Sequence, residues 1–229
     1  MKIIKNEALI KRNSRLGQWT SLAGIIVLAA GMFLTLKRAD LFNYALISLL
    51  LGFILTQVSI YLGNRYGRSP RPDETLDAGL KGLPGDYTLY HFLTPVPHLL
   101  VGPAGIWVLK PYRQAGKVTH RNNRWKMSGG GFMQGYMRFF GQEGMGRPEA
   151  EAEAEIKAVL KQLTRHMDME AIPPINAMLV FTNPDVEVDT GNTPLPALRV
   201  KQVKDFFRQK AKASPLTTEQ IQRLKTAFE

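Results

Sequence analysis

The 229-residue chain contains no cysteine. Without cysteine there is no disulfide framework, no thiolate nucleophile, and no zinc or iron–sulfur site built on thiolates. Acidic residues are also scarce, since 19 Asp and Glu stand against 30 Lys and Arg and leave a formal charge of +11. With 45% hydrophobic residues the chain can build a folded core, which excludes a disordered chain and a small disulfide-stapled one.

Two stretches near the N-terminus lack charge altogether. Residues 16–36 and 41–64 contain no Asp, Glu, Lys or Arg, and about 20 apolar residues suffice to cross a bilayer core as a helix. Only four residues separate the stretches, so we predict a transmembrane hairpin with spans at 16–36 and 41–63. A cleaved signal peptide is the alternative for the first stretch, but that stretch exceeds a typical signal core and the second would still anchor the chain.

The charges that flank the two spans predict their orientation. Five Lys and Arg precede the first span and three arginines follow the second, whereas the turn carries only Lys37 and Arg38. Because cytoplasmic flanks carry an excess of positive charge, we expect a protein of the cell membrane with both termini in the cytoplasm. The chain would then consist of a basic N-terminus at 1–15, the hairpin at 16–64, a linker at 65–72 and a soluble domain at 73–229.

The soluble part has the pattern of an α/β or α+β domain. A helix is predicted at 73–83, and short strands at 87–92, 98–101, 106–109, 117–121 and 124–127, the last two joined by a turn at Asn122-Asn123. A helix rich in Glu and Ala begins at Pro148, and the apolar run 175–181 predicts a strand buried on both faces. We further expect a strand near 197–200, a helix at 203–212 and a last helix capped by Thr217 or Thr218. This order predicts helices layered on one mixed sheet.

Four segments, in this order, resemble the nuclease-related domain (NERD) family of the restriction-endonuclease-like superfamily. They are LDAGLKGLPGDYTLYHFL at 76–93, HLLVGPAGIWVL at 98–109, AMLVFTNP at 177–184 and LTTEQIQRLKTAF at 216–228. The resemblance covers about residues 73–228 and implies a mixed-sheet domain with the restriction-endonuclease-like fold. It also implies a metal-dependent nuclease where the family's motif is intact.

The catalytic motif implied by the resemblance is degenerate in this chain. The family places an aspartate before one strand and a Glu-x-Lys at the end of the next, so that carboxylates hold a divalent cation and the lysine assists the nucleophile. Here those positions hold Pro97, which is followed by His98, and then Lys110 and Tyr112. No Asp or Glu occurs at 87–142 to replace them. We therefore expect no catalytic residues, no metal ligands and no cofactor.

Other polar residues have simpler explanations than a metal site. His91, His98 and His120 are predicted to be sheet residues with polar partners, because three histidines on separate strands seldom converge. Asp73 fits the start of a helix, where an acid complements the dipole. The glutamates at 149–155 alternate along a helix and point in divergent directions, which predicts a solvated acidic face.

The positive excess of the soluble part lies at 110–147, which includes a glycine, methionine and aromatic segment at 128–146. The binding candidates in this region are Lys110, Arg113, Lys117, Arg121, Arg124, Lys126, Arg138, Phe139 and Phe140. Cations interleaved with aromatic rings suit a nucleic acid or the anionic surface of a membrane. The alternative is a loop that fills a gap in the core or packs on a partner subunit.

These observations predict a membrane-anchored NERD-like protein that is catalytically inactive as a nuclease and has a binding or scaffolding role at the cytoplasmic membrane surface. Two alternatives stay open. One is a membrane-tethered, Mg²⁺-dependent nuclease with an atypical site, and the other is a module that binds anionic lipid or assembles with a second copy or a protein partner.

Overall fold

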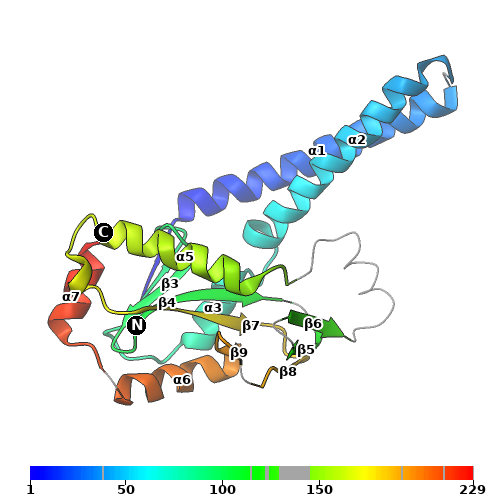
Figure 1. Ribbon diagram of the computed structural model, residues 1–229. Coiled ribbons are helices and arrows are strands. Elements are labelled where there is room, and N and C mark those ends of the chain that lie inside the picture. The colour runs from blue at the N-terminus through cyan, green and yellow to red at the C-terminus, as the bar shows by residue number, and fades with distance from the viewer. Residues whose placement is uncertain are drawn as a thin grey trace. The chain divides into compact units, whose positions relative to one another are not determined.

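The computed structural model describes residues 1–37, 39–113, 115–121, 124–128, 145–191, 193–213 and 215–228. The chain divides into two compact units (Figure 1). One unit comprises residues 7–71, and the other comprises residues 1–6 together with 72–229. Most of the glycine and aromatic segment lies outside the described residues, and with it the candidates Arg138, Phe139 and Phe140.

The first unit is a helical hairpin. Its elements are α1 (Glu7–Lys37), the 3-10 turn η1 (Ala39–Leu41), α2 (Phe42–Leu62) and the π-helical turn η2 (Gly63–Gly67). Both α1 and α2 are long and apolar enough to cross a membrane. The first helix begins well before the predicted span, because the basic residues that precede position 16 continue the same helix.

Small residues line the contact between α1 and α2. The buried positions recur every seven residues and are Ile10, Gly17, Gly24 and Gly31 on α1, and Ala45 and Gly52 on α2. A Cβ added to Gly52 would lie 2.5 Å from Leu28 Cγ, and the Ser59 hydroxyl donates to the Gly17 carbonyl at 2.9 Å. Side chains of this size let two helix backbones approach closely. The large apolar side chains of both helices are exposed, as a lipid-facing surface requires.

The second unit is built on a six-stranded mixed sheet with the order β1-β2-β3-β4-β7-β9. The strands are β1 (Lys2–Lys5), β2 (Thr88–His91), β3 (His98–Gly102), β4 (Gly105–Tyr112), β7 (Ile175–Phe181) and β9 (Ala197–Arg199). Strands β2, β3 and β4 form an antiparallel meander, whereas β1 pairs in parallel with β2, and β7 lies parallel to both β4 and β9. Gly105 makes the tight β3–β4 turn possible, since its φ of +100° strains any other residue.

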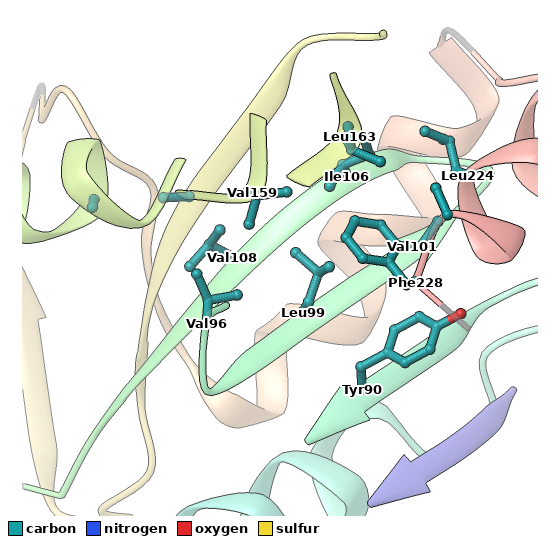
Figure 2. Close-up of a cluster of buried hydrophobic side chains, with 13 residues drawn as sticks. Tyr90, Val96, Leu99, Val101, Ile106, Val108, Val159, Leu163, Leu224 and Phe228 are labelled. Atoms are coloured by element: carbon teal, nitrogen blue, oxygen red, sulfur yellow. The ribbon is translucent and has the colours of Figure 1, made fainter. Parts of the chain in front are cut away.

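Helices cover both faces of this sheet. The helices are α3 (Pro72–Leu80) and α6 (Val200–Ala213) on one face, and α5 (Pro148–Leu163) and α7 (Thr218–Thr226) on the other. Alternation along β4 feeds both cores, because Ile106 and Val108 face α5 and α7 while Trp107 and Leu109 face α3 and α6. Figure 2 shows the first of these cores, where Val159 and other side chains of α5 and α7 pack on the sheet.

A second, three-stranded sheet has the order β6-β5-β8. Its strands are β5 (Gly116–Arg121), β6 (Arg124–Ser128) and β8 (Val186–Asp189). Val118 and Val186 on its inner face pack with Leu179 and Phe181 of β7. The short turn η3 (Met169–Ala171) links α5 to β7.

Several sequence predictions are confirmed at the level of single elements. The structure has the mixed α/β class, the helix that starts at Pro148 and the buried strand over 175–181. Thr217 caps α7 by accepting a hydrogen bond from the Gln220 amide at 3.2 Å. The N-terminus differs from the predicted basic segment at 1–15. Lys2–Lys5 forms an edge strand of the six-stranded sheet, and α1 already begins at Glu7. The predicted helix at 73–83 ends at Leu80.

Candidate functional site

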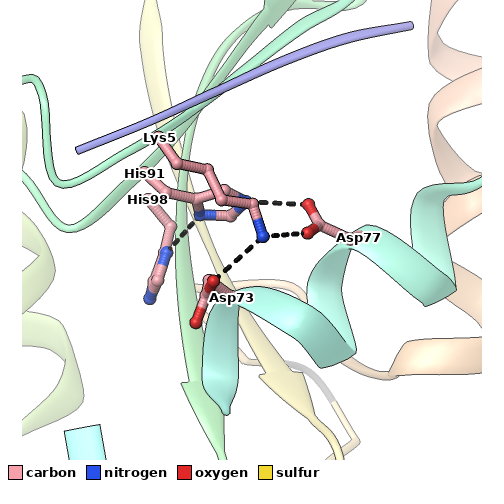
Figure 3. Close-up of polar contacts among 5 residues, drawn as sticks. All are labelled: Lys5, Asp73, Asp77, His91 and His98. Atoms are coloured by element: carbon pink, nitrogen blue, oxygen red, sulfur yellow. Dashed lines mark hydrogen bonds and ion pairs between the residues drawn. The ribbon is translucent and has the colours of Figure 1, made fainter. Parts of the chain in front are cut away.

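Buried polar side chains gather on the α3 face of the six-stranded sheet (Figure 3). They come from the end of β1, the first two turns of α3, the end of β2 and the start of β3, and they are Lys5, Asp73, Asp77, His91 and His98. The sheet register explains the meeting, because Lys5 is the partner of His91 across β1 and β2, and His98 is its partner across β2 and β3. We call these five residues the polar cluster.

Hydrogen bonds connect the polar cluster without a break. The Lys5 ammonium donates to Asp77 and to Asp73 Oδ2, the latter at 3.0 Å. His91 Nε2 lies 3.0 Å from Asp77 Oδ1, and its Nδ1 lies 2.7 Å from His98 Nδ1. At that separation one of the two Nδ1 atoms carries a proton and the other accepts it. The two imidazoles therefore share one proton in this hydrogen bond and cannot both donate to each other.

Burial and charge fix the protonation of the lysine in this cluster. Asp73 and His91 are fully buried. Burial alone would lower the pKa of Lys5, but its hydrogen bonds to Asp77 and Asp73 outweigh burial and raise that pKa. The cluster thus balances one ammonium against two carboxylates.

A second group of polar side chains lies on the α5 face of the same sheet. The Lys110 ammonium lies 2.8 Å from Glu155 Oε1 and 3.2 Å from Glu151 Oε2, and only 9% of the residue is exposed. Trp125 Nε1 donates to Glu149, which also lies 3.6 Å from His120 Nε2.

The predicted solvated face of α5 holds for Glu151 and Glu153, which are exposed, whereas Glu149 and Glu155 are partly buried. Glu149, Glu151 and Glu155 contact side chains of the two sheets, because β4 presents an ammonium to the helix, β5 an imidazole and β6 an indole. Glu153 is exposed and pairs with Lys157 on its own helix.

Tyr112 reports the electrostatics of this second group. Burial raises the pKa of its hydroxyl, and the nearby carboxylates of Glu151, Glu155 and Glu149 raise it further, well above the usual range for tyrosine. The tyrosine is therefore neutral in the folded protein. The Lys110 ammonium, one of the binding candidates from the sequence, is paired with the carboxylates of Glu151 and Glu155.

The structure separates the four degenerate motif positions. His98 faces α3 and belongs to the polar cluster, whereas Lys110 and Tyr112 face α5. Pro97 stands just before β3, where its carbonyl accepts the Phe92 amide at 2.9 Å. Within the described ranges no group of three or more His, Asp and Glu side chains is arranged to hold a metal ion.

The remaining basic candidates lie on and beside the second sheet. Lys117 pairs with Glu187 at 2.9 Å and with Asp189 at 3.4 Å. Four other candidates are exposed and have no carboxylate partner among the residues that the structure describes, namely Arg113, Arg121, Arg124 and Lys126.

Sequence reasoning missed two features of the charge distribution. One is the pairing of Lys5 with α3, which joins residues 68 positions apart and has no local signal. The other is a basic surface on α6, formed by Lys201, Lys204, Arg208, Lys210 and Lys212 against Asp205. A charge count restricted to α6 would have found the basic surface. A count over the whole C-terminal region hides it, because the acids of α5 and β8 balance the cations of α6.

Comparisons of the chain with protein-family models, with curated proteins and with solved structures find no match. The resemblance to the NERD family therefore stays a prediction that rests on the quoted residues alone. Chemically, the polar cluster joins a hydrogen-bonded histidine pair to a lysine with two carboxylates, and the second group surrounds a buried lysine and tyrosine with acids. Both arrangements fix charge inside the domain, whereas the exposed cations of the second sheet are open to an anionic ligand.

Proposed function

We propose that this chain is an integral membrane protein whose α/β domain has the NERD-type, restriction-endonuclease-like fold and a binding or scaffolding role at the cytoplasmic membrane surface. One observation carries the membrane arrangement. Strand β1 precedes α1 and pairs with β2, which follows α2. Because the two strands belong to one sheet, a chain that enters the membrane through α1 must return through α2 to the side it left. The positive flanks of the hairpin favour the cytoplasm as that side.

The order of elements supports the proposed fold. The segments that carry the resemblance form α3 and β2, the β3–β4 hairpin, β7 and α7, and the parallel pairing of β4 with β7 brings the two strongest apolar segments together. The chain thus has an antiparallel meander followed by a helix and a strand parallel to the meander's last member.

The side chains at the motif positions support binding rather than catalysis. The divalent cation that this fold implies needs oxygen ligands at the positions of Pro97 and Lys110, and a proline and an ammonium supply none. Tyr112 stands where the family has its lysine and is neutral. These residues do not fit the metal, so no hydrolytic step can be assigned to them.

A nuclease assay on the full chain in nanodiscs tests the loss of catalysis. The protein is incubated with labelled single- and double-stranded DNA and RNA, with Mg²⁺ or Mn²⁺, and cleavage is followed with and without chelator. We expect no cleavage. Cleavage that chelator abolishes would overturn the assignment and restore an enzyme with an atypical site.

Single cysteines test the membrane arrangement cleanly, because the chain has none of its own. Asp40→Cys, between the two helices, should react with an impermeant maleimide on intact cells. Gln222→Cys, exposed on α7, should react only after permeabilisation. The reverse pattern would place the α/β domain outside the cytoplasm.

A further inference from the structure

The outer face of the β5–β6 hairpin concentrates positive charge. Lys117, Arg121, Arg124 and Lys126 share this face, because cross-strand partners in the register point to the same side. The opposite, inner face carries Val118 and Met127 in the hydrophobic core and His120 and Trp125 beside Glu149, so the cations point away from the core. Glu187 and Asp189 of the neighbouring strand β8 form ion pairs with Lys117.

The pairing of Arg121 with Arg124 points to an anionic ligand. These two arginines are direct partners across the hairpin, and like charges directly opposite each other destabilise a strand pair. Both are exposed, and no carboxylate in the described part of the chain neutralises either of them. An anion bound at this position would relieve their repulsion.

The position of this face within its own unit suggests which anion. Strands β1, β2 and β4 run in the same direction, so their carboxyl ends lie at one end of the six-stranded sheet. Strand β1 ends there with Lys5, just before the chain continues into α1. Helix α3 begins at the same end, soon after the chain leaves α2. The second sheet starts at the same end, shortly after β4 (Figure 1).

We propose that the outer face of the β5–β6 hairpin, with Arg121, Arg124 and Lys126 at its centre, binds the anionic phospholipid headgroups of the membrane in which α1 and α2 lie. This proposal rests on the proposed function, since it requires the hairpin to span that membrane. Basic side chains are attracted to the negative surface of the cytoplasmic leaflet. Strands β5 and β6 carry two ring side chains, His120 and Trp125, and both lie on the inner face. The described outer face therefore offers charge without the rings on which nucleic-acid bases stack.

The basic surface of α6 serves as an internal comparison. Its C-terminal half lies near the opposite end of the sheet, because the Tyr87 hydroxyl, just before β2, donates to the Phe207 carbonyl at 3.3 Å, and Arg208 donates to the Gly82 carbonyl at 3.2 Å. Only the start of α6, which follows β9 directly, lies at the carboxyl ends of the parallel strands. A general attraction of basic side chains to lipid would act on both surfaces. The proposal predicts that only the β5–β6 face approaches the headgroups.

Energy transfer in nanodiscs tests the proposal on the full chain. A donor dye is placed on Ser128→Cys, on the outer face of β6, or on Gln209→Cys, exposed on α6, and the lipid headgroups carry the acceptor. Nanodiscs of phosphatidylcholine are compared with nanodiscs in which part of the lipid is phosphatidylglycerol. Transfer is also measured in about 1 M salt, where the Debye length falls to about 3 Å.

We expect transfer from position 128 to rise at least twofold with anionic lipid and to return to the neutral-lipid value in high salt. The variant Arg121→Gln/Arg124→Gln/Lys126→Gln should lose the rise, whereas Arg208→Gln/Lys210→Gln/Lys212→Gln in the C-terminal half of α6 should keep it. Transfer from position 209 should not respond to lipid charge.

Equal transfer from position 128 in neutral and anionic nanodiscs, or a rise at position 209 instead, would overturn the proposal. The proposal would also be overturned if the Arg121→Gln/Arg124→Gln/Lys126→Gln variant lost binding of a nucleic-acid duplex but kept the response to anionic lipid. Failure of the proposed function is seen earlier and separately, because a protein whose hairpin does not insert would not co-purify with nanodiscs of either composition.

Discussion

Lys5 and Asp73 lie 68 residues apart, on either side of the apolar hairpin in the sequence, and their side chains form an ion pair of 3.0 Å. Asp73 is fully buried, so removal of its partner leaves a carboxylate without its nearest compensating charge. We expect Lys5→Met to lower the free energy of unfolding of the domain by about 2 kcal/mol or more. Chemical denaturation in mild detergent, followed by tryptophan fluorescence, measures this loss.

Lys201→Met on α6 is the matched control for that experiment. Lys201 is exposed, and a surface substitution of this kind changes stability by no more than about 0.5 kcal/mol. A Lys5→Met protein as stable as the control would show that the ion pair contributes nothing to the fold.

The edge strand β1 makes a second prediction about which fragments of the chain can fold. A protein that starts at Asn64 lacks β1 and Lys5, which exposes the edge of β2 and leaves Asp73 and Asp77 without their lysine. We expect that fragment to be poorly folded, whereas residues 1–6 joined by a short flexible linker to residues 72–229 should fold. Amide hydrogen exchange at β2 compares the two, and equal protection of β2 in both would contradict the prediction.

Local pattern was sufficient for much of this fold. The uncharged stretches, the Pro148 helix with its early glutamates, the apolar strand over 175–181 and the Thr217 cap are signals that occupy a few consecutive residues. The structure places the Pro148 helix, the apolar strand and the Thr217 cap within a few positions of the prediction, because burial, helix dipole and capping act over one or two turns. Helix α1, in contrast, begins at Glu7, well before the predicted span.

The missed features depend on residues that are distant in sequence. Strand β1 is four residues with a lysine at each end, and it becomes a strand only because β2 offers an edge. Glu155 reads as part of a solvated row until β4 places Lys110 beneath it. Nothing in the sequence near these residues records the pairing, so the polar cluster and the acidic surroundings of Tyr112 could not be predicted.

The glycines of the hairpin carry a third prediction. A Cβ on Gly52 would lie 2.5 Å from Leu28 Cγ and 3.3 Å from the backbone nitrogen of Leu28, so a larger residue must push α1 and α2 apart. We expect Gly52→Val to destabilise the hairpin by about 1 to 3 kcal/mol, the usual cost of overpacking. Thermal unfolding in detergent measures the effect. Gly63→Ala is the control, since a Cβ on Gly63 meets nothing within 4 Å, and an equal loss in both variants would argue against close helix packing.

The buried tyrosine of β4 predicts how stability depends on pH. Burial and the carboxylates of Glu151, Glu155 and Glu149 raise the pKa of Tyr112, so the folded state keeps a proton that the unfolded chain releases above about pH 10. The contribution of this proton to the free energy of unfolding is fully present below that pH. It is lost as the pH rises further, by no more than about 1.4 kcal/mol per pH unit.

Tyr112→Phe should make the alkaline loss of stability less steep. Denaturation between pH 8 and 11.5 measures the slope, and Lys5, whose pKa is also raised, should preserve part of it. Tyr44→Phe, in an exposed position of α2, is the control and should keep the full slope. Identical slopes for Tyr112→Phe and the unchanged protein would mean that the hydroxyl of Tyr112 titrates in the folded state as it does in the unfolded chain.

The two lysines that face carboxylates on this domain predict opposite outcomes for the same substitution. Lys110 is buried between Glu151 and Glu155, and Glu155 Oε2 is itself buried with no hydrogen-bond partner in the described structure. Lys110→Met therefore leaves two neighbouring carboxylates uncompensated, and we expect it to lower the free energy of unfolding by about 3 kcal/mol.

Lys117→Met removes exposed ion pairs with Glu187 and Asp189, and such pairs contribute at most about 1 kcal/mol to the free energy of unfolding. Urea denaturation of both variants at neutral pH makes the comparison. A Lys110→Met protein that is no less stable than Lys117→Met would mean that the lysine at the degenerate motif position is not what holds α5 against β4.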